Sequence, residues 1–288
     1  MFEGFETRRI ETAGAEIHLS LGGWGPPLLL LHGYPQSHVM WHKVAPALAE
    51  RFTVVAADLR GYGDSSKPPG GEKHENYSKR AMARDQVEVM AALGFERFSV
   101  VGHDRGARVT HRLALDHPAR VEKAAVLDIA PTYTMYQRAD RDFATAYYHW
   151  FFLIQPFDLP ERLIGADPDY YLEWKIGAWG RTENAFGPAA LAEYKRCFGD
   201  PATIHASCED YRAAAGIDLA HDAADLDRKV ACPLLVLWGA KGVVARSYDV
   251  LALWRERAVE VGGRALDCGH YLPEEAPEET LSELLAFL

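Results

Sequence analysis

The chain has 288 residues, of which 48% are hydrophobic and 25% are charged, an ordinary globular composition with enough apolar material for a core. The 31 Lys and Arg residues against 41 Asp and Glu residues give a net charge of −10, which argues against binding to nucleic acid or to an anionic membrane surface. A substrate that is itself an anion would therefore need a local cluster of cations.

No segment has the pattern of a secretory signal or of a membrane span. Residues 1–9 lack a basic start followed by an apolar stretch, and the apolar run at residues 26–31 is too short to cross a bilayer. The cysteines are scattered without CxxC spacing, so we expect free, buried thiols in a reducing cytoplasm rather than metal ligands or disulfides. They are Cys197, Cys208, Cys232 and Cys268.

Short apolar runs that alternate with helix-compatible stretches predict an α/β fold with a largely parallel sheet. Strands are expected at residues 6–11, 16–21, 28–32, 52–58, 98–101, 124–129, 234–239 and 264–266. Helices are expected between them, at residues 40–50 and 79–93. In such sheets the functional side chains gather at the carboxyl ends of the strands.

The pattern changes between residues 131 and 226, where strand signals vanish and aromatic-rich stretches follow one another. Helices are expected there at residues 143–154, 169–179 and 188–198. We predict a core formed by residues 1–130 and 227–288, with a helical cap over the strand ends at residues 131–226.

One pentapeptide, Gly102-His103-Asp104-Arg105-Gly106, follows the strand expected at residues 98–101. It has the frame of the G-x-S-x-G elbow, in which a strand turns sharply into a helix and presents one side chain at the apex. Asp104 stands where esterases have serine. A carboxylate there can attack a saturated carbon that bears a leaving group and form an ester with the protein.

Together with His32–Pro35 and Asp58–Ser66, this elbow resembles the α/β-hydrolase fold, and within it the haloalkane dehalogenases and epoxide hydrolases that use an aspartate nucleophile. The segments Gly102–Arg108, Asp128–Thr132 and Tyr148–Trp150 are similar to haloacetate dehalogenases, including those that cleave fluoroacetate. The resemblance covers essentially the whole chain. It implies hydrolysis of small anionic 2-haloacids, with neither metal nor organic cofactor, by a homodimer.

Two further residues complete the catalytic group that this family uses. His270 lies in a loop after the last expected strand, where the fold supplies its general base. Asp128 is the acid that orients it, because residues 240–243 after the neighbouring strand contain no carboxylate and the family pattern also points to Asp128. By the fold's rule, the backbone amides of Arg105 and Tyr34 form the oxyanion hole.

Arg105 and Arg108 lie three residues apart, on one face of the helix expected after the elbow. They are expected to grip the substrate carboxylate in paired hydrogen bonds, although one of them could instead pair with a surface acid. The resemblance assigns halide binding to His149, Trp150 and Tyr211, and places Lys175 and Trp179 at the substrate entrance. For each of these cap residues the simpler alternative is packing, most of all for Trp150.

Two other functions stay open on the sequence alone. An epoxide hydrolase shares the nucleophile, base and acid, and activates its substrate through cap tyrosines, of which this chain has Tyr147, Tyr148, Tyr170 and Tyr171. The arginine pair argues against a neutral epoxide. The other alternative is a catalytically silent ligand-binding protein of the same fold, against which the complete set of nucleophile, base and acid argues.

Overall fold

The computed structural model describes all 288 residues and contains one eight-stranded sheet in the order β1-β2-β4-β3-β5-β6-β7-β8. The strands are β1 (Glu6–Glu11), β2 (Glu16–Gly23), β3 (Pro27–Leu31), β4 (Thr53–Ala57), β5 (Phe98–His103), β6 (Val121–Leu127), β7 (Leu234–Gly239) and β8 (Val261–Leu266). β2 runs antiparallel to β1 and β4, and the other pairs are parallel. The predicted α/β class, with a mostly parallel sheet, is confirmed.

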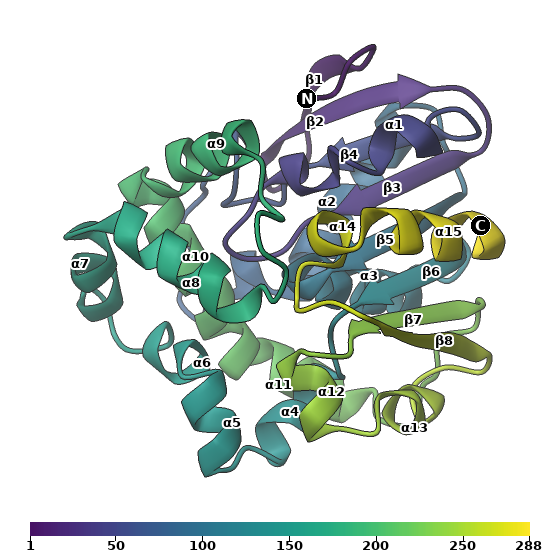
Figure 1. Cartoon of the computed structure of the whole chain (residues 1–288). Coiled ribbons are helices and arrows are strands. Elements are labelled where there is room, and N and C mark those ends of the chain that lie inside the picture. The colour runs from purple at the N-terminus through teal and green to yellow at the C-terminus, as the bar shows by residue number, and fades with distance from the viewer.

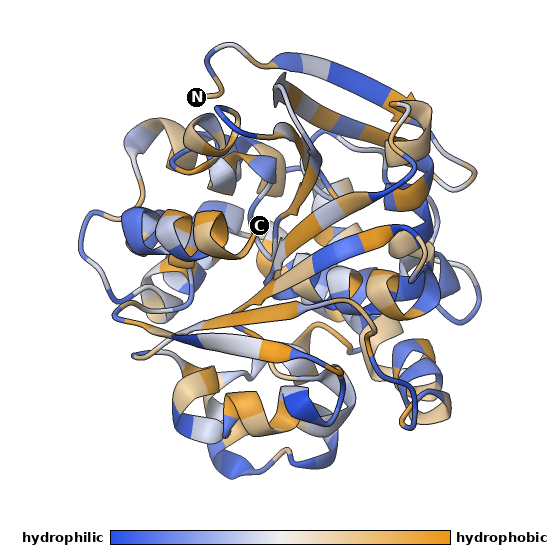
Figure 2. Ribbon diagram, turned by 90° about the vertical axis from the view of Figure 1, so that its right-hand side faces the viewer, coloured by the Kyte–Doolittle hydropathy of each residue, from blue (hydrophilic) through white to orange (hydrophobic).

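The central strands are apolar because helices cover both of their faces. The side chains of Leu28–Leu31 in β3 are fully buried, as are those of Val54–Ala57 in β4. Figure 2 shows hydrophobic strands in the interior and hydrophilic stretches on the outer helices and loops. β1, at the edge, is exposed along most of its length and carries charged residues, which discourages pairing with another chain.

Helices lie on both faces of the sheet. α2 (Lys79–Ala92) and α3 (Asp104–Asp116) pack behind it in Figure 1, while α1 (Ala45–Leu48) and α15 (Pro277–Phe287) lie in front. The single helix expected at residues 40–50 is instead the short turn η1 (His38–Trp41) followed by α1. Pro46 explains the difference, because its ring would clash with the carbonyl of His42 in a continuous helix.

The segment between β6 and β7 contains eight helices and no strand, and in Figure 1 it lies to one side of the sheet. We call residues 131–226 the cap segment. The helices are α4 (Thr132–Gln137), α5 (Arg141–Ala146), α6 (His149–Phe152), α7 (Leu159–Gly165), α8 (Pro168–Trp179), α9 (Pro188–Phe198), α10 (Pro201–Ala215) and α11 (Ile217–Ala224). The stretch expected as one helix at residues 143–154 is divided into α5 and α6, which the apolar pattern alone does not reveal.

The remaining short elements flank the last two strands or precede α2. They are η2 (Glu75–Tyr77), α12 (Val243–Ser247), α13 (Val250–Arg255) and α14 (Leu272–Glu275). None of the helices combines the length and the apolar character needed to traverse a lipid bilayer.

α3 crosses β3 at Gly106, where the two backbones approach closely. A Cβ atom on Gly106 would lie 2.4 Å from the carbonyl oxygen of His32 and 2.5 Å from that of Leu31. Both neighbours are backbone atoms of the sheet and cannot rotate away. Glycine at this position therefore sets the distance between the elbow helix and the sheet.

We expect Gly106→Ala to lower the free energy of unfolding by about 3 kcal/mol, because the added methyl group forces α3 away from the sheet. Urea denaturation followed by circular dichroism measures the change. Gly177→Ala is the matched control: Gly177 is also helical, but its Cβ would meet nothing within 4 Å. That control should gain about 0.5–1 kcal/mol from helix propensity. Equal stability of the two variants would contradict this account of the elbow.

Candidate active site

Three loops that follow parallel strands bring the predicted catalytic residues together. Asp104 follows β5, Asp128 follows β6 and His270 follows β8. The strand ends are aligned, since Leu127 pairs with both His103 and Leu237 across the sheet. The sheet therefore presents one carboxylate, a second carboxylate and an imidazole at the same edge.

The elbow holds Asp104 in an uncommon backbone conformation, with a φ of +45°. Non-glycine residues rarely adopt positive φ, and in this fold the strain lifts the apex side chain out of the turn. Glycines make the room: a Cβ on Gly33 would lie 2.5 Å from the Cβ of Asp104, and one on Gly102 would lie 2.4 Å from the carbonyl oxygen of Gly106. The structure thus has the strand–turn–helix geometry that the G-x-D-x-G pattern predicts.

The two oxygens of the Asp104 carboxylate have different surroundings. Oδ1 accepts a hydrogen bond of 3.0 Å from the backbone amide of Tyr34. The amide of Arg105 lies in the first turn of α3, where amides have no partner within the helix. Oδ2 lies 3.9 Å from Nε2 of His270. Burial raises the pKa of Asp104, but the positive charges of His270, Arg108 and Arg105 outweigh it and lower the pKa below its usual value.

His270 is held by a buried partner. Its Nδ1 lies 2.6 Å from Oδ2 of Asp128, whose Oδ1 accepts a 2.9 Å hydrogen bond from the amide of Gly239. Burial opposes the charged imidazole, but the bond to Asp128 and the charges of Asp128 and Asp104 raise the pKa of His270. The loop is braced by Glu275, which accepts hydrogen bonds from the amides on either side of His270. Nδ1 is thus occupied, and Nε2 faces Asp104.

The two arginines are buried and lie near Asp104, and each already has protein partners. Arg105 donates hydrogen bonds from Nε and Nη2 to the Asp210 carboxylate, at 2.8 and 2.6 Å, and its Nη1 is buried without a partner. Arg108 donates from Nη1 to Ala130 and Thr132 and leaves Nε without a partner. Arg105 therefore has no free two-pronged edge, whereas Arg108 has Nε free beside an Nη2 whose one contact is the sulfur of Met135 at 3.4 Å. Each still offers N–H donors and a full positive charge.

Aromatic residues of the cap segment stack on these two cations. The Tyr211 ring lies 4.2 Å from the Arg105 guanidinium carbon, and the Trp150 ring lies 4.8 Å from that of Arg108. His149 packs against Tyr211 with ring centroids 5.4 Å apart, and its Nδ1 is buried without a partner. Burial and the neighbouring positive charges hold the pKa of His149 well below its usual value, so its imidazole is neutral.

Lys175 and Trp179, both on α8, are buried rather than exposed at a rim. The Trp179 ring lies 4.6 Å from that of His149 and 5.3 Å from that of His270, so Trp179 forms part of the site wall. The Nζ of Lys175 lies 3.8 Å from the ring centroid of Tyr148 and 4.8 Å from that of Trp179, with no carboxylate beside it. Burial lowers the pKa of Lys175 to about 6.

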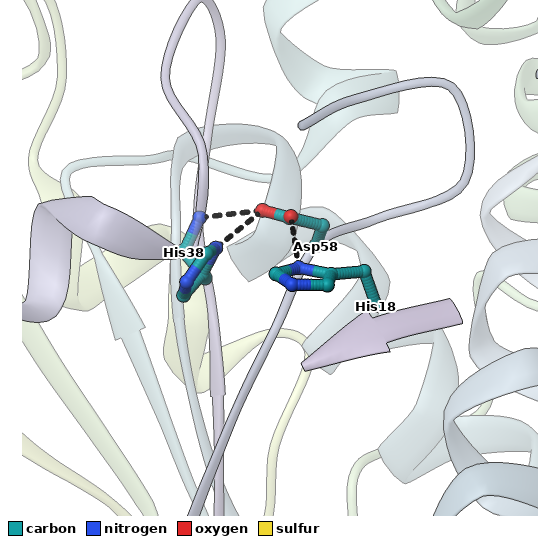
Figure 3. Close-up of side chains that lie close together, drawn as sticks. All are labelled: His18, His38 and Asp58. Carbon is teal, nitrogen blue, oxygen red and sulfur yellow. Dashed lines mark hydrogen bonds and ion pairs between the residues drawn. The ribbon is translucent and has the colours of Figure 1, made fainter. Parts of the chain in front are cut away.

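A second cluster of ionisable groups, His18, His38 and Asp58, lies outside this site (Figure 3). The Nδ1 atoms of His18 and His38 lie 2.8 and 2.9 Å from different oxygens of Asp58. The backbone amides of His38 and Asp64 also donate to this carboxylate. Four N–H donors satisfy Asp58, so the geometry is that of a hydrogen-bonded brace for the loop that carries Tyr34 rather than a metal site.

Sequence reasoning missed Asp210, which accepts hydrogen bonds from Nε and Nη2 of Arg105. It also missed the two other groups that bind Asp210, Tyr62 and Lys79. Little in the sequence signals the role of Asp210, because it lies beside Glu209 and Arg212 in a helix of mixed polarity and resembles a surface charge. Glu275, which braces the His270 loop, carried no clearer signal.

Comparison with known proteins agrees with this geometry. A family model described as alpha/beta hydrolase fold matches residues 26–277. Fluoroacetate dehalogenase from Burkholderia sp. is 50% identical over 100% of this chain and 95% of its own length. Soluble epoxide hydrolase from Corynebacterium sp. (strain C12) is 36% identical over 95% of this chain and 94% of its own.

Among solved structures, a protein from Nostoc sp. PCC 7120 described as an alpha/beta hydrolase is 66% identical. It superimposes with a TM-score of 0.99, and the match covers 100% of this chain and 99% of that one. The sheet order, the elbow after β5 and the histidine after β8 fit the same architecture. This chain belongs to the alpha/beta hydrolase fold family.

Proposed function

We propose that this protein hydrolyses the carbon–halogen bond of small 2-haloacids such as haloacetate, releasing glycolate and halide through a covalent aspartyl ester. The observation that carries the proposal is the arrangement around Asp104. An ionised carboxylate stands at the elbow, two buried arginines lie beside it, and a histidine–aspartate pair faces one of its oxygens. The cations suit a substrate that is itself a carboxylate, in a protein whose net charge would otherwise repel it.

In the first step, Oδ2 of Asp104 attacks the α-carbon of the haloacid from the side opposite the halogen. A carbon–oxygen bond forms as the carbon–halogen bond breaks, and the halide leaves with the bonding electrons. Arg105 and Arg108 hold the substrate carboxylate through Nη1 and Nε, the groups that their protein partners leave free. Alignment of this kind lowers the barrier because the reacting atoms are already in line.

In the second step, His270 takes a proton from water, and the hydroxide formed attacks the carboxyl carbon of Asp104. The negative charge develops on Oδ1, where the amides of Tyr34 and Arg105 stabilise it. As the acyl–oxygen bond breaks, the imidazolium of His270 returns its proton to the departing oxygen and glycolate is released. The carboxylic acid left on Asp104 loses its proton to water, which restores the carboxylate. Esterification removes one charge that raises the pKa of His270, so the neutral imidazole, the form that can accept a proton, is favoured at the stage that needs it.

The departing halide needs donors, since fluoride in particular is a poor leaving group. We assign this role to His149, Trp150 and Tyr211 of the cap segment. A neutral imidazole, an indole and a phenol each carry one N–H or O–H that can point at an anion. Such donors act where charge develops and therefore accelerate the step itself.

Epoxide hydrolysis is the second candidate, because it uses the same nucleophile, base and acid. Tyr147 favours it: this cap tyrosine is buried and its ring lies 5.3 Å from that of His149. An assay that supplies chloroacetate, fluoroacetate and styrene oxide separates the two functions by halide release or diol formation. A purely ligand-binding protein would produce neither.

We also propose that Lys175 and Trp179 control access to the site. A surface cleft of about 470 Å³, lined by residues 176, 177 and 180–186, adjoins both residues in sequence.

Two finer points stay predictions. A reducing cytoplasm, expected from the scattered cysteines, is the first of them. A homodimer, implied by the family resemblance, can be tested by light scattering.

His270→Ala should stop turnover after one equivalent of halide, because the ester forms but no base activates water. We expect turnover to fall at least 100-fold. Intact-protein and peptide mass spectrometry should find the carboxymethyl ester on Asp104. The control Asp104→Asn should give neither halide nor adduct. A His270→Ala enzyme that turns over at the wild-type rate would rule out this mechanism.

His149→Ala should reduce defluorination more than dechlorination. Fluoride depends more on donors as it leaves, so we expect the ratio of fluoroacetate to chloroacetate turnover to fall about tenfold. Ion-selective electrodes measure both halides from the same enzyme preparation. Equal losses with both substrates would show that His149 has no special role toward fluoride.

Lys175→Met should stabilise the protein near neutral pH, because the buried amine is held neutral there. The folded pKa of Lys175, about 6, lies below its unfolded value, so the unfolded state binds more protons between those two values. Wild-type stability therefore rises with pH in that window, by roughly 1 kcal/mol per pH unit from this group. Denaturation at pH 6.5 and pH 9 should show the variant's advantage shrinking. Lys73→Met, at an exposed position, should show no such trend.

A further inference from the structure

Asp210 forms the best-connected buried ion pair beside the proposed active site. Its side chain is fully buried on α10 of the cap segment. The carboxylate accepts hydrogen bonds from Nε and Nη2 of Arg105, from Nζ of Lys79 and, at 2.7 Å, from the hydroxyl of Tyr62. All three partners lie outside the cap segment. Arg105 is on α3, Lys79 is at the start of α2 and Tyr62 is in the loop after β4. These contacts join the cap segment to the core directly behind the elbow.

The contacts determine where the Arg105 guanidinium points. A guanidinium is planar and its five N–H groups move as one rigid unit. Asp210 occupies the edge formed by Nε and Nη2, and its backbone carbonyl accepts a further bond of 2.9 Å from Nη2. The ring of Tyr211, the next residue, covers the guanidinium face. Nη1 is the nitrogen left, buried and without a protein partner.

We propose that Asp210 is a positioning residue, which aims Nη1 of Arg105 at the substrate carboxylate while it fastens α10 to the core. The inference rests on the proposed function, in which that carboxylate lies beside Asp104. It follows that Arg105 offers the substrate one nitrogen rather than a two-pronged grip. Asp210 and Tyr211 are consecutive, so the residue that aims the cation and the proposed halide donor share one turn of α10.

The pattern of ion pairs supports a positioning role over a purely structural one. Two cations, Lys79 and Arg105, face two carboxylates, Asp210 and Asp218, and Arg105 pairs with Asp210 alone. Lys79 also lies 3.6 Å from Asp218 on α11, a second attachment of the cap segment that does not touch Arg105. Arg112 on α3 also pairs with Asp222 and Asp225 of the cap segment, so several ion pairs attach this segment to the core without touching Arg105. Asp210 is therefore not needed for attachment alone.

The test compares Asp210→Asn with the matched control Asp218→Asn, since each removes one buried carboxylate from Lys79. For both variants and the wild type, KM and kcat are measured with chloroacetate, and the Kd of glycolate is measured by calorimetry. In Asp210→Asn we expect KM and Kd to rise about tenfold or more, because the single amide oxygen of asparagine cannot accept hydrogen bonds from both Nε and Nη2 of Arg105 as a carboxylate does. We expect kcat to fall less than about threefold. In Asp218→Asn, KM and Kd should stay within twofold of the wild type.

Values of KM and Kd within twofold of the wild type in Asp210→Asn would overturn the proposal, as would an equal rise in Asp218→Asn. No measurable binding of glycolate to the wild type would also overturn it. If Asp210→Asn does not fold, Tyr62→Phe tests the proposal instead, because it removes only the 2.7 Å hydrogen bond from the Tyr62 hydroxyl to Asp210. That variant should raise KM and Kd two- to fourfold, and unchanged values would count against the inference. Wild-type protein that binds glycolate but releases no halide would refute the proposed function, and the glycolate Kd values of the variants would then test by themselves whether Asp210 positions Arg105 toward a bound carboxylate.

Discussion

The close approach of backbone at the elbow is the constraint on which the rest of the site depends. Gly33, Gly102 and Gly106 allow β3, β5 and α3 to meet at distances that any Cβ atom would prevent. Asp104 is held there with positive φ, and its carboxylate meets the amide of Tyr34. A strained residue persists only when its surroundings leave no alternative, and here the packed sheet and helix supply those surroundings.

Charged groups of the protein surround the Asp104 carboxylate. His270, Arg105 and Arg108 favour the ionised form of Asp104, and each is itself held by groups behind it. Burial strengthens these interactions, because little water is present to screen them. The cap segment supplies Asp210, the buried partner of Arg105.

Much of the fold could be predicted because its signals are local. The strands from β3 to β7 are apolar runs between turn residues, and the helices α8 and α9 follow the apolar pattern of the cap segment closely. The predictions that were wrong are two helices that the structure shows to be interrupted. The helix expected at residues 40–50 is broken because of Pro46, which is a local signal. The division between α5 and α6 is marked by no comparable residue.

The sequence by itself determined the α/β class and the place of the elbow, and it predicted the histidine and the acid that the structure brings near Asp104, because each follows from a motif or from its place after a strand. Only the tertiary structure decided which arginine pairs with an acid. The sequence left open that one of the two does so and did not indicate which one. Asp210 lies 105 residues further along and reaches Arg105 only when the cap segment folds over the core. Pairing of buried charges across such a distance depends on the packing of whole helices, which no local pattern records.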